Sequence, residues 1–308
     1  MRILVTGGAG FIGSHVVQTL LQRGDDVTVL DDLRHGLRDN VSSQAAFIRL
    51  DMTCPSLGEI VGRNHFDAIV HLAAQTRVDT SMEHPKYDTH ENVMGTVDIL
   101  EFACTHHVGR VIFASSAAVY GNPGEDALPI HETQPLQPLS FYGYSKMTAE
   151  GYLKLYHDCY GLDYVVLRFA NVYGERKEID DEGGVIDVFA KRAAKGLPIT
   201  IYGDGKQSRD YIYVGDIASG IVAALETTHV NEAYNLSTER EVTLLDVIDM
   251  LRRGCGLSLQ PAFAATRSGD IYRSVLSHEK AKSLLLWEPH MTIENGLVKT
   301  YQYFRDHT

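Results

Sequence analysis

A tyrosine and a lysine four residues apart, Tyr142 and Lys146, are the side chains of this sequence best suited to acid–base chemistry. On a helix, residues at this spacing share one face. A neighbouring ammonium favours the phenolate and lowers a phenol pKa that is otherwise about 10. Tyr144 lacks such a partner, because the residue four positions further on is Thr148. The spacing therefore predicts that Tyr142 is a general acid or base near neutral pH, provided that the rest of the chain supplies a reaction.

The composition of the 308-residue chain is that of an ordinary globular protein with room for one large or two modest domains. Its net charge of −12 argues against a nucleic-acid partner, because phosphate-backbone sites need a positive field. The sequence opens directly on a strand pattern, so we expect no signal peptide, and no apolar run is long enough to span a membrane. Dispersed histidines indicate no metal site, and the scattered cysteines predict free, mostly buried thiols in a reducing cytoplasm. These cysteines are Cys54, Cys104, Cys159 and Cys255.

A glycine-rich turn follows the first predicted strand, residues 2–6, and leads into a helical pattern that ends at Gly24. Its glycines, at positions 7, 8, 10 and 13, fit both GxGxxG and GxxGxxG. Glycine permits a tight turn and the close approach of a pyrophosphate to the positive end of the following helix. The next predicted strand, 27–30, ends at Asp31, the distance expected for a carboxylate on an adenosine ribose. Since Asp31 would repel a 2′-phosphate, the motif predicts NAD rather than NADP.

Strand and helix patterns alternate through the first half of the chain, which predicts an α/β fold with a doubly wound parallel sheet. Further strands are expected at 46–50, 67–72, 110–114 and 164–169. The strand at 110–114 delivers Ser115 and Ser116 at its carboxyl end, where ligands bind in open parallel sheets. A helix is expected to begin at Pro85, and Asn92 in its first half is either a site residue or a surface amide. The proline-rich segment 121–140 is predicted to be non-helical.

The second half offers fewer regular patterns. Strand character is found at 200–203 and 211–214, an amphipathic helix is expected over 244–251, and the apolar run 284–287 predicts the core of a C-terminal domain. Arg209 and Arg267 lie in segments rich in glycine and aromatic residues. Guanidinium groups bind phosphate oxygens in a bidentate way, so two arginines suit a diphosphate, with surface salt bridges as the alternative.

A series of motifs runs in order along essentially the whole chain: TGGAGFIGSH at 6–15, HLAAQ at 71–75, SSAAVYG at 115–121, YGYSK at 142–146, LRFANVYG at 167–174, YGDGKQSRDYIYVGD at 202–216, RSGDI at 267–271 and W-x-P at 287–289. In these motifs the chain resembles the extended short-chain dehydrogenases/reductases of the NAD-dependent epimerase/dehydratase family. Within that family it is most similar to nucleotide-sugar epimerases of the UDP-glucose 4-epimerase type.

The resemblance implies a Rossmann domain over 1–168, with a later return near 206–235, and a smaller discontinuous α/β domain formed mainly by 169–308. It further implies a homodimer that pairs through helices near 85–107 and 144–160. A stripe of tyrosines at 152, 156 and 160 suits that use, or a place in the core.

The resemblance also assigns site residues. Tyr142 matches the family's catalytic base, Lys146 the lysine that binds the nicotinamide ribose, and Ser116 the hydroxyl near the reacting carbon. The implied NAD site consists of Gly7, Gly10, Phe11, Ile12, Gly13, Asp31, Asp51, Met52, Leu72, Ala73, Ala74, Gln75, Asn92, Ser115, Tyr142, Lys146 and Phe169. The implied UDP-sugar site consists of Ser116, Asn171, Val185, Thr200, Tyr202, Arg209, Arg267, Asp270 and Ser274.

The activity implied is epimerisation at C4 of a UDP-hexose, with UDP-glucuronate epimerisation, dehydration and decarboxylation as alternatives. The dehydratases of the family carry an Asp-Glu pair after the serine or threonine, and the decarboxylases keep a Glu there. This chain has Ala117-Ala118 instead, which favours the epimerase. A non-enzymatic NAD-binding regulator is the alternative from a different class, although such relatives typically lose the tyrosine or the lysine. Ser274 stands where some members have a tyrosine that excludes N-acetylated sugars, so acceptance of both plain and N-acetyl sugars is expected.

Overall fold

The larger sheet of the protein consists of parallel strands in the order β10-β6-β5-β4-β1-β2-β3. The structure, a computed structural model, describes residues 1–176, 184–266 and 271–307. The strands of this sheet are β1 (Arg2–Thr6), β2 (Asp26–Asp31), β3 (Ala46–Arg49), β4 (Ala68–His71), β5 (Arg110–Ser116), β6 (Asp163–Phe169) and β10 (Glu232–Leu236). Their carboxyl ends lie on one edge of the sheet, so the predicted doubly wound fold is confirmed.

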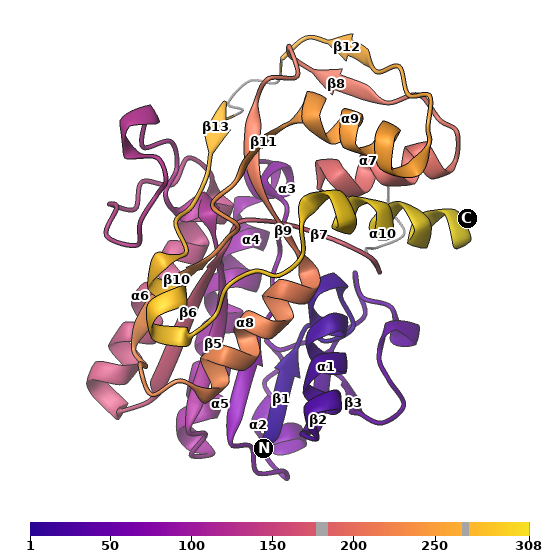
Figure 1. The fold of residues 1–308 in the computed structure, drawn as a ribbon. Helices are drawn as coiled ribbons and strands as arrows, with labels where there is room; N and C mark the ends of the chain where they lie inside the picture. The colour runs from indigo at the N-terminus through magenta and orange to yellow at the C-terminus, as the bar shows by residue number, and fades with distance from the viewer. Residues whose placement is uncertain (177–183, 267–270, 308) are drawn as a thin grey trace.

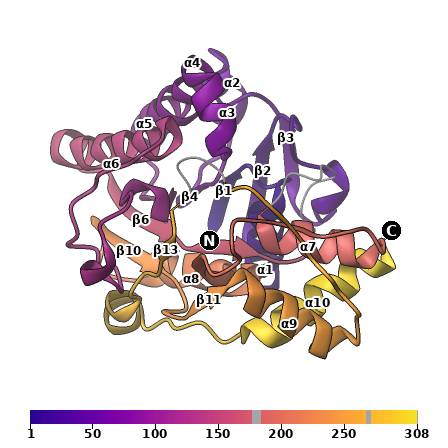
Figure 2. The same ribbon diagram turned by 90° about the horizontal axis from the view of Figure 1, so that it is seen from above.

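Helices cover both faces of this sheet (Figure 2). One face packs against α1 (Phe11–Arg23) and α8 (Val214–Glu226), and the other against α2 (Leu57–Val61), α5 (Gly95–Thr105) and α6 (Phe141–Tyr160). Because side chains alternate along a strand, β1 places Ile3 and Val5 in the first core and Leu4 in the second. All three side chains are fully buried.

The helix predicted to begin at Pro85 does begin there, but it is not continuous. It runs as α4 (Pro85–Thr89), a π-turn η2 (His90–Met94) and then α5. π-turns occur as single insertions in helices and are frequent at functional sites. The remaining short helical elements of the first half are η1 (Arg38–Asn40), α3 (Val78–Glu83), η3 (Ala117–Val119) and η4 (Glu125–Ala127). The last of these is one short helical turn inside the segment predicted to be non-helical.

A second body lies at the end of the molecule opposite the N-terminus (Figure 1). Its strands are β7 (Asn171–Tyr173), β8 (Thr200–Tyr202), β9 (Ser208–Tyr213), β11 (Glu241–Thr243), β12 (Ala262–Ala264) and β13 (Arg273–Ser274). Strand β9 pairs with β7, β11 and β13, while β8 and β12 form a separate pair. With α7 (Val185–Ala194), α9 (Leu244–Cys255) and α10 (Ile293–Asp306) they enclose a third core.

The chain passes between the two bodies more than once. After β9, helix α8 and strand β10 return to the larger sheet. A second return brings η5 (Ala281–Leu285) and Trp287 against the same core, where the Trp287 indole donates to the Ser219 hydroxyl at 2.9 Å. The prediction that 284–287 forms the core of the C-terminal domain is therefore wrong. The run packs on the larger sheet, and Leu286 within it is 88% exposed.

The structure bears on two expectations drawn from the sequence, the state of the cysteines and the length of apolar segments. No disulfide links the cysteines, but none of them is buried: three are half-buried and Cys159 is exposed, so the prediction of mostly buried thiols is wrong. Within the part of the chain that the structure describes, no helix combines the length and the apolar character needed to cross a membrane.

Candidate active site

The start of α6 positions the tyrosine and the lysine. Ser140 precedes the helix and its hydroxyl accepts from the Gly143 amide at 3.1 Å, which satisfies one of the free N–H groups at the helix start. Gly143 allows the helix to lie directly on η3, because a Cβ at this position would stand 2.5 Å from the Ala118 carbonyl oxygen. Tyr142 and Lys146 follow on one face of this helix.

Lys146 is buried, and its ammonium points toward β5. The Nζ atom donates to the Ala114 carbonyl at 3.0 Å and lies 4.9 Å from the centre of the Phe113 ring. Burial lowers the pKa of Lys146 to about 8, although the Asp88 and Glu150 carboxylates oppose that change. Lys146 is thus still mostly charged at neutral pH, but it loses its proton at a much lower pH than an exposed lysine does.

Tyr142 is half-buried at the carboxyl end of β5, where its hydroxyl forms a hydrogen bond with Ser116. Burial raises the pKa of Tyr142, the Ser116 hydrogen bond lowers it, and the charge of Asp88 raises it further. The prediction that Lys146 lowers the pKa of Tyr142 is therefore wrong for this arrangement. The ammonium is bound to the Ala114 carbonyl, and desolvation of the phenolate outweighs the hydrogen bond from Ser116.

Ser115 and Ser116 leave β5 in different directions. The Ser116 hydroxyl accepts from the Ala118 amide at 3.2 Å and remains on the side of Tyr142. The Ser115 hydroxyl donates to Glu150 at 2.5 Å, and Glu150 also binds Arg168 in a bidentate ion pair at 3.1 and 2.6 Å. The Ser115 side chain is therefore engaged in a buried structural network, which leaves its backbone as the part able to meet a cofactor.

Asn92 is not a surface amide, since it is only 1% exposed. Its Oδ1 accepts from the Gln75 amide at 2.8 Å, and its Nδ2 lies 2.9 Å from the Gln75 carbonyl and 3.0 Å from the Ser145 hydroxyl. Both Gln75 and Asn92 also donate to Asp88, a carboxylate that sequence reasoning missed. Through these hydrogen bonds, Asn92 links the loop after β4 to the start of α6.

The glycine turn has the shape that a pyrophosphate needs. Gly7 has φ +69°, and a Cβ there would stand 2.7 Å from the Ala73 amide nitrogen. A Cβ on Gly13 would stand 2.1 Å from the Gly7 carbonyl oxygen, so helix and turn are in close contact. Gly10, by contrast, meets nothing nearer than 3.4 Å and precedes the first turn of α1, which contains Phe11 and Ile12. This open position at the helix N-terminus is suited to a phosphate group, so the residues present fit a dinucleotide.

The carboxylates predicted for the adenosine end lie at the ends of β2 and β3. Asp31 accepts from the amides of Ala9 and Leu33, each at 2.9 Å, and burial raises its pKa. Each oxygen keeps one acceptor site for a ribose hydroxyl. Burial opposes ionisation of Asp51, but hydrogen bonds from Thr53 and the charge of Arg34 bring the pKa of Asp51 below its ordinary value.

Arg34 is a second residue that sequence reasoning missed. It pairs with Asp32 at 2.7 Å and with Glu91 at 2.9 Å, and it also binds Asp51. It therefore joins the loop after β2 to the π-turn that carries Asn92. No glycine or aromatic motif marks it in the sequence, and only the three acids that surround it in space reveal its position.

The remaining predicted cofactor residues line the carboxyl ends of the central strands. Leu72 and Ala73 follow β4, and their amides lie 3.2 Å from the Thr6 hydroxyl. Met52 packs beside the π-turn, where a Cβ on Gly95 would stand 2.4 Å from its methyl carbon. Ala74 continues the same loop toward Gln75, and Phe169 is the last residue of β6, 6% exposed.

The second body brings three of the predicted substrate residues onto neighbouring strands. Arg209 on β9 lies opposite Ser274 on β13, and Asn171 on β7 lies opposite Tyr211 of β9. Ser116 and Phe169 are themselves register partners, so the strand that leads to Asn171 passes directly beside Ser116. Sheet pairing thus connects the acid–base residues with Asn171.

The other predicted substrate residues are more dispersed. Val185 is the first residue of α7, and Thr200 and Tyr202 lie on β8, which belongs to the separate two-stranded pair. Tyr202 is 40% exposed. Arg267 and Asp270 lie outside the described residues.

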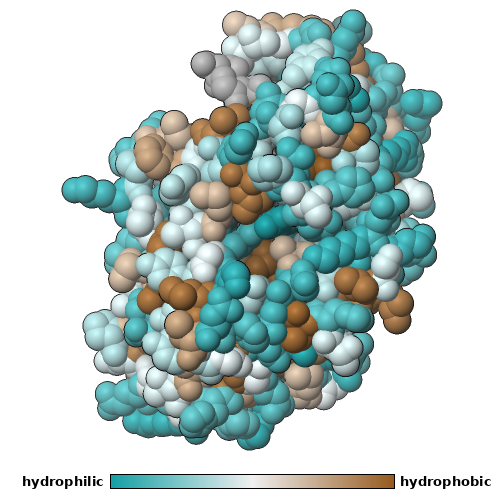
Figure 3. Space-filling view, turned by 90° about the vertical axis from the view of Figure 1, so that its left-hand side faces the viewer, coloured by the Kyte–Doolittle hydropathy of each residue, from teal (hydrophilic) through white to brown (hydrophobic). Residues whose placement is uncertain are grey.

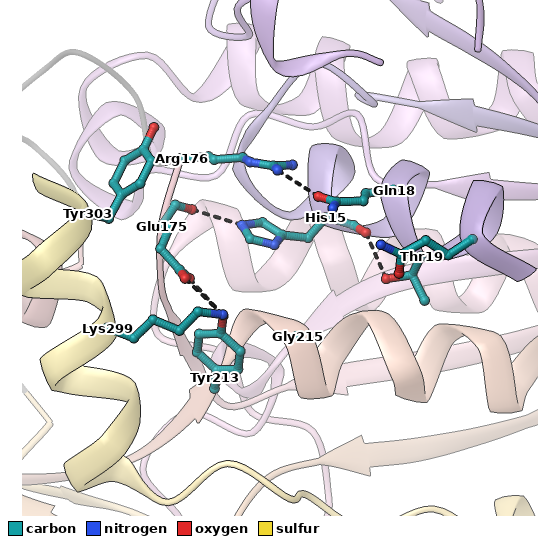
Figure 4. Close-up of a pocket in the computed structure, with 10 residues that line it drawn as sticks. His15, Gln18, Thr19, Glu175, Arg176, Tyr213, Gly215, Lys299 and Tyr303 are labelled. Atoms are coloured by element: carbon teal, nitrogen blue, oxygen red, sulfur yellow. Dashed lines mark hydrogen bonds and ion pairs between the residues drawn. The ribbon is translucent and has the colours of Figure 1, made fainter. Parts of the chain in front are cut away.

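A cavity of about 380 Å³ lies between α1 and α10, and none of the predicted site residues lines it (Figure 4). In this cavity the Glu175 carboxylate binds Lys299 at 3.0 Å and accepts from the Tyr213 hydroxyl at 2.8 Å. The Glu175 backbone carbonyl lies 3.0 Å from the His15 ring. The cavity is therefore a polar junction between the two bodies and not the acid–base site. Among the described residues, no group of three or more His, Cys, Asp or Glu side chains could hold a metal ion.

The combination of a dinucleotide-binding sheet with a Tyr/Lys pair at its carboxyl edge defines a dinucleotide-dependent oxidoreductive enzyme. Residues 3–237 match the NAD dependent epimerase/dehydratase family. A putative UDP-glucose 4-epimerase of Methanocaldococcus jannaschii is 39% identical over 99% of this chain and 98% of its own. The crystal structure of a UDP-glucose 4-epimerase from Thermotoga maritima with UDP-glucose has a TM-score of 0.96 at 38% identity, covering 100% of this chain and 99% of that one.

A further structure, the UDP-glucose 4-epimerase of Thermus thermophilus in complex with NAD, has a TM-score of 0.93 at 39% identity and covers 100% of both chains. The protein therefore belongs to the NAD dependent epimerase/dehydratase family and is an NAD-dependent enzyme acting on nucleotide sugars. Other matches carry other activities. They include a UDP-glucuronic acid 4-epimerase of Bacillus cereus at 31% identity and a UDP-glucuronic acid decarboxylase of Arabidopsis thaliana at 35% identity.

Proposed function

We propose that the protein epimerises C4 of a UDP-hexose, interconverting UDP-glucose and UDP-galactose through a transient 4-keto sugar. The observation that carries this proposal is the composition of the site around Tyr142. Ser116 and Lys146 are present beside it, while Ala117 and Ala118, which follow Ser116 in η3, offer no carboxylate. A site with one acid–base group and a hydride carrier suits reversible oxidation at a single carbon.

NAD, when bound, supplies the acceptance and return of a hydride. Tyr142 takes the proton of the sugar O4 hydroxyl and later gives it back, a transfer worth about 10²–10⁴-fold in rate. Ser116, already hydrogen-bonded to the phenol, holds the same oxygen. Lys146, with Asn92 and Gln75, would hold the nicotinamide end of the cofactor.

Elimination of water or loss of carbon dioxide makes different demands on the site. A dehydratase needs an acid and a base beyond the tyrosine, and neither Ala117 nor Ala118 can serve. The carboxylate of Glu150 is occupied by Arg168 and Ser115, and that of Asp88 accepts from the side-chain amides of Gln75 and Asn92. This supports epimerisation over the dehydratase and decarboxylase activities of other relatives.

On the substrate side, we propose that Arg209 and Asn171 bind the diphosphate, with Arg267, and that Tyr202 lies near the uracil and Asp270 near its ribose. Thr200 and Val185 complete this side of the site. Ser274 is half-buried and lies opposite Arg209 in the β9–β13 register. A small side chain there leaves room beside the sugar, which supports acceptance of N-acetylated UDP-sugars as well.

The test is a turnover assay with a panel of UDP-sugars, with products separated by chromatography. We expect UDP-glucose and UDP-galactose to interconvert, and UDP-N-acetylglucosamine and its galacto-epimer to do so as well. Absence of any N-acetyl conversion contradicts the role given to Ser274. Faster conversion of UDP-glucuronate, or release of a 4-keto-6-deoxy sugar, contradicts the proposed function itself.

We further propose a homodimer that pairs through α5 and α6 and the segments that lead into them. Apolar side chains on α6 are exposed, among them Tyr152 (37%), Leu155 (53%) and Tyr160 (71%). On the side of the molecule where α6 lies, hydrophobic residues form clusters among hydrophilic ones (Figure 3). Light scattering coupled to gel filtration should give twice the mass of 34.2 kDa, and Leu155→Glu should shift the protein toward a monomer. A monomeric wild-type protein contradicts the proposal.

A further inference from the structure

Asp88 is a fully buried carboxylate beside the acid–base site to which the predicted chemistry assigns no task. It lies in α4, four residues before Asn92, and its exposure is 0%. Aspartate is almost never fully buried unless its charge is compensated. The burial of Asp88 therefore requires an explanation from its surroundings.

The hydrogen bonds of Asp88 all converge on one oxygen. Its Oδ1 accepts from the Gln75 side-chain amide at 2.7 Å and from the Asn92 side-chain amide at 3.1 Å. Its Oδ2 is buried without a hydrogen-bond partner among the described residues. Two neutral amides orient the carboxylate but do not neutralise its charge.

The charge of Asp88 can be compared with that of Glu150, the other carboxylate that acts on Lys146. Glu150 also faces Lys146, but its charge is met by Arg168 at 2.6 Å. Asp88 has no ion-pair partner among the described residues, and its charge acts on both Lys146 and Tyr142. His71 is a further titratable group near Lys146. Burial and the lysine charge lower its pKa to about 3, so it stays neutral.

Asp88 is also connected to the start of α6 by hydrogen bonds. The Asn92 amide that donates to Asp88 lies 3.0 Å from the Ser145 hydroxyl, and that hydroxyl donates to the Tyr142 carbonyl at 2.9 Å. The carboxylate therefore fixes the orientation of Asn92, and Asn92 in turn contacts the helical turn that carries both Tyr142 and Lys146.

We propose that Asp88 is a positioning residue, whose buried charge keeps Lys146 in the ammonium form at neutral pH and whose Oδ1 orients Asn92 against the first turn of α6. An unscreened carboxylate favours a nearby ammonium and disfavours a nearby phenolate. Removal of the charge thus moves the titrations of Lys146 and Tyr142 in the same direction, toward lower pH. Loss of packing alone would lower activity without moving either titration.

The deciding experiment titrates Lys146 directly in the full-length protein. Lysine side chains are labelled with ¹³C, the Cε resonance of Lys146 is assigned by its absence in Lys146→Arg, and its midpoint is compared between wild type and Asp88→Asn. Asparagine keeps an acceptor oxygen for Gln75 and Asn92 and removes the charge. We expect the midpoint to fall by about one pH unit, the size of shift that a close opposite charge produces. Asp79→Asn is the matched control, because Asp79 lies on the adjacent α3 with 65% of its side chain exposed, and it should leave the midpoint unchanged.

The second measurement rests on the proposed function. In Asp88→Asn both limbs of the pH profile of kcat/KM should move to lower pH, so that the loss relative to wild type is largest above pH 8 and smallest near pH 6. An unchanged Lys146 midpoint in folded Asp88→Asn overturns the inference, whatever the activity. A shifted midpoint in a protein that epimerises no UDP-sugar would instead refute the proposed function and leave the inference standing. Should Asp88→Asn not fold, Asp88→Ser removes the same charge and is judged by the same midpoint.

Discussion

The larger sheet and the second body differ in how far apart along the chain their contacting segments lie. In the larger sheet, β1 and β2 are neighbours separated only by α1, and β4, β5, β6 and β10 each follow a helix that packs on the sheet. In the second body, β9 pairs with residues 171–173, 241–243 and 273–274, which no local pattern connects. The first body places most of its proposed cofactor residues at the ends of strands that such helices join, although Thr6 also contacts Leu72 and Ala73 far along the chain. The second body places its proposed substrate residues only once distant segments have paired.

The largest effect on activity is expected from Tyr142→Phe, which should separate catalysis from cofactor binding. The phenol makes no contribution to the glycine turn, so bound NAD should be retained while kcat falls by about 10²–10⁴-fold or more. Turnover and the NAD released on denaturation measure the two properties independently. Tyr144→Phe, an exposed neighbour on the same helix, is the control and should keep wild-type turnover. Loss of NAD from Tyr142→Phe would mean that catalysis and cofactor binding are not separable in this way.

Gly13→Ala tests the claim that backbone contacts hold the first body. A Cβ there would stand 2.1 Å from the Gly7 carbonyl oxygen, and neither atom belongs to a flexible side chain. We expect the free energy of unfolding to fall by about 1–3 kcal/mol and NAD affinity to fall with it, as measured by urea denaturation and NAD titration. Gly151→Ala on α6 meets nothing within 4 Å and should instead stabilise the protein by up to about 1 kcal/mol. Equal effects at the two positions would refute the argument.

Arg209→Lys tests the substrate side of the second body. A lysine keeps the charge but loses the bidentate geometry that suits a diphosphate, so KM for the UDP-sugar should rise about tenfold, equivalent to about 1.4 kcal/mol. NAD affinity should not change. Arg240→Lys, whose guanidinium pairs with Glu294 at 2.7 Å on the surface, is the control. An unchanged KM in Arg209→Lys would place the diphosphate elsewhere.

The smallest effect is expected at the junction of the two bodies. Although burial opposes it, hydrogen bonds from Tyr213 and Lys299 bring the pKa of Glu175 below its ordinary value of 4.5. This contribution to stability is therefore present above about pH 4.5 and is lost as the pH falls through the folded-state pKa. Lys299→Met should cost about 1 kcal/mol or less at pH 7, and the difference from wild type should shrink on acidification. Urea denaturation at a series of pH values measures it, and a difference that grows toward low pH would contradict the assignment.

Much of the first body could be predicted from the sequence, because its signals are local. The strand at residues 2–6, the helix end at Gly24 and the serines at the end of β5 all follow from periodicity and glycine positions, and each is confirmed. The π-turn was not predicted, since a single extra residue leaves the apolar spacing of the helix nearly unchanged. Asp88 was missed for a related reason: an acid just after Pro85 is typical of an exposed helix start, and only the folded chain buries it.

The errors share a physical origin in long-range packing. Leu285 and Trp287 are buried in a core while Leu286 is exposed, and composition does not say which core such a run joins. The pKa of Tyr142 depends on which acceptor the Lys146 ammonium reaches, and that acceptor, the Ala114 carbonyl, lies on another element. Arg34 has no motif and becomes visible only with its three acidic partners around it. Spacing along a helix therefore gives the face on which a side chain lies, and tertiary contacts decide what it does there.

The return of the chain to the larger sheet at Trp287 has a consequence for engineering. The indole is anchored on α8 at Ser219 and on the Asp216 carbonyl at 3.2 Å, after the strands of the second body have been completed and before α10. The half of the chain that we propose binds the substrate is therefore not one contiguous segment. An exchange of substrate preference between two relatives cannot be made by one crossover point in the gene. It has to be assembled strand by strand, with the segment around Trp287 kept matched to the recipient's own α8.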